Sequence, residues 1–189
     1  IIEKRKIPRW SVALEADTPA FTVLVPTLNP TEIFAGILTA LDIGLGLAAR
    51  GYRVRFIATD LPVSSHAVSR GFLIQRLSAQ DMASGTADRI ALHCGVSSAT
   101  LPGHKGDIYL ATAWWSAHIA HRLIDAHALE QRDFFYLIQD FEPNFYAWGS
   151  EFADAMASYD LGCGHTSCPP PSRPLWPPRS GAQHVSHRT

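Results

Sequence analysis

Short apolar runs alternate along the chain with segments of helical periodicity. Buried strands are expected where a few apolar residues stand together between turn residues. The strands predicted in this way are residues 21–26, 52–58, 72–77, 107–111 and 134–138, with either a strand or a turn of helix at 89–93. Helices are predicted from residue 29 to 51 and at 63–71, 115–127 and 150–159.

Strands that alternate with helices indicate parallel βαβ units with right-handed crossovers. The pattern therefore predicts an α/β fold, a single Rossmann-like layer sandwich with a mostly parallel sheet over residues 21–161. The first helix has the clearest boundaries. Asn29 stands at its expected N-cap, Pro30 and Glu32 suit its first turn, and Gly51 ends it.

The two ends of the chain differ from this core. Residues 1–20 are basic and then contain proline without sustained periodicity, so we interpret them as a leader or edge segment. In residues 162–189 there is no acidic residue, and proline is too dense for a helix or a central strand. This tail is interpreted either as disordered or as an out-of-frame translation, and it is left out of the fold prediction.

Composition narrows the class of protein. The chain has 189 residues, 47% of them apolar, which is enough for one core. Its formal net charge is −1 and no segment concentrates Lys or Arg, so nucleic acid is not an expected partner. Three cysteines are too few for a disulfide framework, which favours a reducing compartment. No apolar run is long enough to span a membrane, and a cytoplasmic location is predicted.

Polar and aromatic side chains follow the last predicted strand. Gln139, Asp140 and Glu142 come directly after it, then Tyr146 and Trp148. In open α/β sheets, ligands bind beyond the carboxyl ends of the strands. Amides and carboxylates bind hydroxyl groups, and flat rings cover the apolar face of a pyranose. The segment therefore predicts a sugar-binding surface.

The same segment carries a resemblance to a known family. Gln-Asp-Phe-Glu-Pro-x-Phe-Tyr-x-Trp-Gly-Ser-Glu, at 139–151, resembles a block in bacterial rhamnan-synthesis rhamnosyltransferases of the WsaF type. These are GT-B glycosyltransferases related to family four. Residues 106–115 also resemble their counterpart there, and 34–37 resembles a Phe-Gly-Gly-Ile loop in which Ala35 replaces the first glycine.

The resemblance covers roughly residues 21–162 and implies the N-terminal half of a GT-B fold. In that architecture the N-terminal domain holds the acceptor glycan, and a C-terminal domain holds the nucleotide sugar. Nothing in the chain corresponds to the C-terminal domain, and the chain begins at Ile1 rather than Met. A truncated copy that is inactive alone is therefore expected.

The resemblance also implies roles for single residues. Either Asp140 or Glu142 would accept the proton of the acceptor hydroxyl, while the other orients the sugar. The alternative is a helix-entry loop in which both carboxylates cap backbone N–H groups. Thr112 and Trp114 are carried over as pocket-lining positions, against the alternative that each tryptophan simply packs under the next helix.

The glycine, histidine and cysteine patterns indicate neither a dinucleotide-binding motif nor a metal site. Gly36 would let the backbone approach a substrate closely, or it is a structural glycine at a helix entry. Gly44 and Gly46 lie inside a predicted helix, so they do not form a dinucleotide fingerprint. Neither the histidines nor the spacing of Cys163, His165 and Cys168 indicates a metal site. No metal and no cofactor is expected, apart from the nucleotide sugar as donor substrate.

Three functions stay open on the sequence alone. The first is the acceptor domain of a glycosyltransferase that transfers a deoxyhexose, rhamnose in the family that the chain resembles, to a surface polysaccharide. A peripheral association with the inner membrane face would suit this function. The second is a non-catalytic glycan-binding or decayed fragment. The third, and least favoured, is a nicotinamide-binding Rossmann protein.

Overall fold

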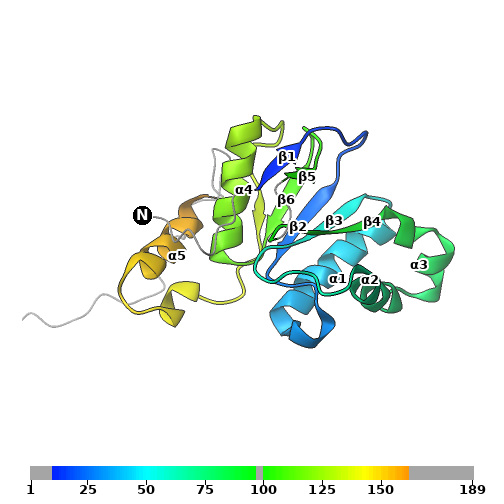
Figure 1. Ribbon diagram of the computed structural model, residues 1–189, viewed down its shortest axis with the longest axis horizontal. Coiled ribbons are helices and arrows are strands. Elements are labelled where there is room, and N and C mark those ends of the chain that lie inside the picture. The colour runs from blue at the N-terminus through cyan, green and yellow to red at the C-terminus, as the bar shows by residue number, and fades with distance from the viewer. Residues whose placement is uncertain (1–9, 97–99, 162–189) are drawn as a thin grey trace, which may run out of the picture.

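The computed structural model describes residues 10–96 and 100–161. Its main sheet, as far as these residues show it, has five parallel strands in the order β4-β3-β2-β6-β7 (Figure 1). They are β2 (Phe21–Val25), β3 (Val54–Ala58), β4 (Ile90–Cys94), β6 (Ile108–Ala111) and β7 (Phe135–Tyr136). The α/β class and the parallel sheet predicted from the sequence are confirmed, and the arrangement is that of a Rossmann-like half-domain.

Helices cover both faces of this sheet (Figure 1). They are α1 (Ala35–Ala49), α2 (His66–Gln75), α3 (Ala79–Ala83), α4 (Trp114–His127) and α5 (Ser150–Leu161). Short 3₁₀ turns occur at η1 (Pro30–Glu32), η2 (Thr86–Arg89) and η3 (Glu142–Phe145). α1 and α2 lie on one face, α4 lies on the other, and α5 packs against α4.

Alternation along the strands builds a separate core on each face. Val23 and Phe56 belong to the core beneath α1, whereas Leu24 and Ile57 belong to the core beneath α4. Successive strand residues point to opposite faces, so a central strand with helices on both sides is mostly apolar, and polar residues such as Arg55 need a buried partner. This is why the apolar runs of β2 and β3 identified them in the sequence.

Two glycines of the first helix have distinct roles. A Cβ on Gly44 would overlap the ring of Phe56, so this glycine lets α1 lie close to the sheet. Gly51 follows the helix at φ 96°, the left-handed conformation that ends helices. The predicted end of the helix is therefore confirmed.

The predicted start of that helix is wrong. Asn29 precedes only η1, and α1 begins at Ala35. The Asn29 side chain instead donates to the Pro62 carbonyl and accepts a hydrogen bond from the Ser64 backbone N–H. It ties the loop after β2 to the loop after β3, because a turn residue satisfies whichever backbone groups lie nearest.

The predicted strand at 72–77 is also wrong, since α2 continues to Gln75. Ser65 caps this helix by accepting a hydrogen bond from Val68 N–H, and Ser69 and Leu73, four residues apart, are its buried positions. The segment at 89–93, for which strand and helix were both open, contains strand β4.

A second, two-stranded sheet pairs β1 (Ser11–Ala13) with β5 (Thr100–Pro102). Trp10 and Val12 are buried in the core on the α4 face. The sequence analysis assigned no strand to either segment, because three residues are too short for alternation to show. The segment 162–189 lies outside the described residues.

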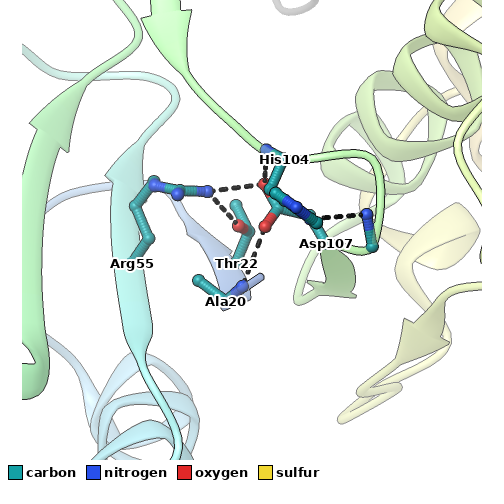
Figure 2. A network of polar contacts seen from close by, with 6 residues as sticks. Ala20, Thr22, Arg55, His104 and Asp107 are labelled. Carbon is teal, nitrogen blue, oxygen red and sulfur yellow. Dashed lines mark hydrogen bonds and ion pairs between the residues drawn. The ribbon is translucent and has the colours of Figure 1, made fainter. Parts of the chain in front are cut away.

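A buried polar network fixes the amino ends of the three central strands (Figure 2). Arg55 on β3 is paired with Asp107, which directly precedes β6, at 2.7 Å. The second carboxylate oxygen of Asp107 accepts a hydrogen bond from Ala20 N–H at 2.8 Å, just before β2. This network lies at the edge of the sheet opposite to the carboxyl ends.

Candidate functional site

The carboxyl edge of the sheet contains a switch point between β2 and β6. These strands are neighbours, but the chain continues from β2 to one side of the sheet and from β6 to the other. Thr112, the residue after β6, donates its hydroxyl to the Leu24 carbonyl at 2.7 Å and so joins the two strand ends. Ligands of open α/β sheets bind in the crevice outside such a point. Thr112 therefore lies at the carboxyl edge of the sheet, and its role as a pocket-lining residue stays a prediction.

Gly36 and Gln139 meet beside this switch point. The Gln139 side-chain N–H₂ donates to the Gly36 carbonyl at 2.7 Å, and a Cβ on Gly36 would overlap the Gln139 side chain. Gly36 lies in the first turn of α1 and has an ordinary helical backbone, so the glycine is required by this close approach and not by its φ angle.

Glu142 is bound to the start of α4. Its Oε2 accepts hydrogen bonds from the backbone N–H of Trp114 at 2.6 Å and from the hydroxyl of Tyr136 at 3.2 Å. A carboxylate at a helix N-terminus satisfies an otherwise unpaired donor and interacts favourably with the helix dipole. The structure thus gives Glu142 the contacts that the capping alternative requires.

Asp140 lies in a different environment. Its side chain is exposed, and Oδ1 accepts a hydrogen bond from the backbone N–H of Phe141, the next residue, at 2.7 Å. Within the described residues its Oδ2 has no hydrogen-bond partner. Asp140 is therefore the carboxylate of this segment that can receive a proton from a bound ligand without breaking a structural contact.

Two tyrosines hold the loop that carries both carboxylates. The Tyr159 hydroxyl accepts from Glu142 N–H and donates to the Asp140 carbonyl, both at 3.2 Å. Burial raises the pKa of Tyr159, and burial raises the pKa of Tyr136 strongly, with the charge of Glu142 adding to both. Both phenols therefore keep the protons that they donate in these hydrogen bonds.

Trp114 is fully buried, and its indole N–H donates to the Tyr146 hydroxyl at 3.0 Å. With no exposed ring face, Trp114 packs under α4 and positions Tyr146.

Trp115 is the tryptophan at the sheet edge. Its ring is partly exposed, and its N–H donates to Thr59, the residue after β3, at 3.3 Å.

Trp148 forms an exposed aromatic surface at the entry to α5. It is 90% exposed and stacks on Phe152, with ring centroids 4.8 Å apart and planes 18° from parallel. Phe145 nearby in the sequence is 65% exposed. One face of the Trp148 ring is held in a fixed plane by Phe152, which leaves the other face open for stacking.

The structure brings the predicted site residues into three contact groups. In the first, Gly36 contacts Gln139; in the second, Trp114 contacts both Glu142 and Tyr146; in the third, Tyr159 links Asp140 to Glu142. Trp148 lies outside these groups and stacks on Phe152. The sequence analysis missed Tyr136 and Tyr159, because a hydroxyl in an apolar run or on a helix does not reveal its partner.

The strand order and the polar loops at the switch point define a Rossmann-like α/β domain with a binding edge. A family model described as "WsaF, N-terminal domain" matches residues 20–165, and the chain belongs to this family. The chain is thus a glycosyltransferase-related domain, and the resemblance found in the sequence is confirmed. No curated protein matches the chain.

The described residues contain neither a cluster of metal ligands nor a helix that could span a membrane. In ranges 10–96 and 100–161 no three His, Cys, Asp or Glu side chains lie together as metal ligands would. Cys163, His165 and Cys168, whose spacing was not taken to indicate a metal site, lie outside these ranges. The same ranges contain no helix with the length and apolar character that crossing a membrane requires.

Proposed function

We propose that the chain is the acceptor-binding N-terminal domain of a glycosyltransferase. The transferred sugar is a deoxyhexose, rhamnose by family resemblance, and the acceptor is a growing surface polysaccharide. In the GT-B architecture that the resemblance implies, a second, C-terminal domain holds the nucleotide sugar, and turnover requires both domains. The observation that carries the proposal is the exposed Asp140 carboxylate beside the switch point, with one oxygen unbound in the described part of the chain.

The two carboxylates take different parts in the proposed reaction. Asp140 accepts the proton of the acceptor hydroxyl as the new glycosidic bond forms. Glu142 is a positioning residue, since its contacts to Trp114 N–H and to the Tyr136 hydroxyl hold the loop in place. Gln139 lies between Asp140 and Gly36, and its exposed amide is suited to bind a sugar hydroxyl.

The Trp148 surface suits a neutral saccharide better than a membrane. An apolar pyranose face stacks on an open aromatic ring. The segment 133–161 contains only acidic charges and no Lys or Arg: Asp133, Asp140, Glu142, Glu151, Asp154 and Asp160. An anionic lipid surface attracts basic segments and repels acidic ones. We therefore assign Trp148 to a sugar unit of the acceptor and place the protein in the cytoplasm.

A non-catalytic glycan-binding protein is the second candidate. It is supported by the same Trp148–Phe152 stack, which needs no donor domain to bind a saccharide. Nicotinamide binding is less favoured, because Gly44 lies inside α1 against Phe56 and not at a strand-to-helix turn.

Acceptor binding is tested with the chain itself and a rhamno-oligosaccharide, by saturation-transfer NMR and calorimetry. Trp148→Ala is expected to weaken binding about 3- to 10-fold, the loss of one stacking contact. Asp160→Asn, which removes an exposed acid at the far end of α5, is the matched control. No saturable binding, or equal losses in both variants, would contradict the proposal.

Catalysis is tested after fusion to a donor domain of the same family. Asp140→Asn is expected to leave acceptor affinity nearly unchanged and to lower turnover by at least about 10²-fold, as the loss of a general base does. Full turnover in this variant would assign Asp140 to binding alone. Saccharide binding without turnover in the fused wild type would favour the glycan-binding candidate.

A further inference from the structure

A hollow lies at the amino edge of the sheet, opposite to the switch point. Its volume is about 290 Å³, and it is lined by the segment before β2, the starts of β3 and β4, and the turn η2. Every one of these elements except β4 contributes charged side chains, which are Asp17, Arg53, Arg55, Asp88 and Arg89. The proposed glycosyl transfer uses none of them.

Arg55 is the central group of this hollow. Its side chain is only 8% exposed, and Nη1 donates to Thr22 at 3.0 Å and to Asp107 at 2.7 Å (Figure 2). Among the described residues, Nε and Nη2 have no hydrogen-bond acceptor. These two nitrogens form the edge of a guanidinium that binds carboxylate or phosphate in a bidentate manner.

Asp107 holds Arg55 in place without using that edge. Both carboxylate oxygens are already engaged, Oδ1 with Ala20 N–H at 2.8 Å, and Oδ2 with Arg55 and with His104 N–H at 3.0 Å. The guanidinium is therefore fixed before any ligand arrives, and a ligand does not have to order it. Such preorganisation lowers the entropic cost of binding.

The neighbouring charges define the class of ligand. Arg53 lies two residues before Arg55, on the same side of β3, and is exposed; within the described chain neither Arg53 nor Asp17 nor Asp88 forms an ion pair. Arginine side chains bind oxyanions, whereas the carboxylates of the two aspartates accept hydrogen bonds from hydroxyl groups. The arginines and aspartates together therefore favour a ligand that carries an oxyanion and a hydroxyl group.

We propose that this hollow is a binding site for a small phosphorylated or carboxylated polyol. Arg55 and Arg53 bind the oxyanion, and Asp88 or Asp17 accepts a hydroxyl of the same molecule. The three guanidinium charges of the hollow are balanced by Asp17, Asp88 and Asp107. Selectivity therefore comes from the placed donors and acceptors and not from a net positive field.

The test is a titration at low ionic strength, followed by NMR of the backbone amides. The probes are glycerol 3-phosphate, inorganic phosphate and glycerol. Glycerol 3-phosphate is expected to bind more tightly than phosphate, and glycerol alone not to bind. The affected amides should be those of residues 16–20, 53–55 and 88–91. Arg53→Gln, an exposed position, is expected to weaken binding about tenfold, the value of one charge-assisted hydrogen bond.

Two further variants make the test specific. Arg132→Gln removes one positive charge at the same sheet edge near β7, roughly 14 Å away across three strands, and should leave binding unchanged. Asp88→Asn should strengthen the binding of inorganic phosphate and reduce the advantage of glycerol 3-phosphate over it. Equal effects of Arg53→Gln and Arg132→Gln, or equal binding of the two phosphates, would overturn the proposal. The assay does not involve the switch-point site, so its outcome is independent of glycosyl transfer.

Discussion

Gly36 and Gln139 are separated by 103 positions in the chain and meet through one hydrogen bond at the switch point. The contact places an exposed amide directly over the first turn of α1. Family resemblance pointed to both residues, but it did not show that they contact each other. Their pairing depends on the order of strands in the sheet, which residue spacing does not encode.

Gly36→Ala tests this contact. The new methyl group would overlap Gln139, so the hydrogen bond to the Gly36 carbonyl is lost. Stability is expected to change by less than about 1 kcal/mol, because a better helix former offsets one lost hydrogen bond. Urea unfolding measures this change, and the Gln139 side-chain amide resonances report the displacement.

A double-mutant cycle with Gln139→Ala provides the control. If the two residues act only through their contact, the effect of Gly36→Ala on saccharide binding disappears in the Gln139→Ala background. Additive effects would show that Gly36 contacts the ligand independently.

At the scale of elements, the start of α4 depends on a residue from a distant loop. The Glu142 carboxylate accepts a hydrogen bond from Trp114 N–H and a second one from the Tyr136 hydroxyl. The pattern Asp-x-Glu after a strand is equally typical of a catalytic pair and of a helix-entry cap. The distances show different surroundings for the two acids, on which the proposed division of roles rests.

Glu142→Ala is therefore expected to destabilise the domain by about 1–3 kcal/mol, since it leaves a buried donor without a charged partner. Glu142→Gln keeps an acceptor oxygen and should cost less than half as much. Asp140→Ala, which removes only a contact to the next residue, is the matched control and should stay within about 0.5 kcal/mol. Urea unfolding of the three variants decides the point, and equal losses at both positions would contradict the assigned roles.

The same scale shows where sequence patterns fail. The strands β2 and β3 were predicted because residues buried on both faces must be continuously apolar. The segment 72–77 has the same apolar character, yet it lies mostly in α2, where Ser69 and Leu73 face the core. A short apolar run does not distinguish a strand from a buried helix turn, and the cap at Ser65 was the missing signal.

At the scale of the whole molecule, the alternation of strands and helices predicted the layer architecture. It did not predict the long-range contacts that connect these elements. The three-residue strands β1 and β5 and the pairing of Arg55 with Asp107 connect segments far apart in the chain. Charged residues in an apolar strand, such as Arg55 in β3, indicate a buried partner. The sequence does not tell which of the many acids that partner is.

The pair of Arg55 and Asp107 is expected to dominate the stability of the sheet. Asp107→Ala leaves a guanidinium that is 92% buried without its counter-ion, because the wild-type side chain is only 8% exposed. The expected loss is about 3–5 kcal/mol in the free energy of unfolding by urea. Asp42→Ala, which breaks the exposed pair with Arg76 at 2.7 Å, is the control and should cost less than about 1 kcal/mol.

A double variant separates the contribution of charge from that of packing at the contact between Arg55 and Asp107. Arg55→Met with Asp107→Leu removes both charges and keeps apolar volume, so it should recover much of the stability lost in Asp107→Ala. It leaves Ala20 N–H and His104 N–H without their acceptor, which limits the recovery. A loss in Asp107→Ala no larger than in Asp42→Ala would mean that water reaches Arg55 through the hollow and replaces the carboxylate. Full recovery in the double variant would instead show that this contact depends on packing alone.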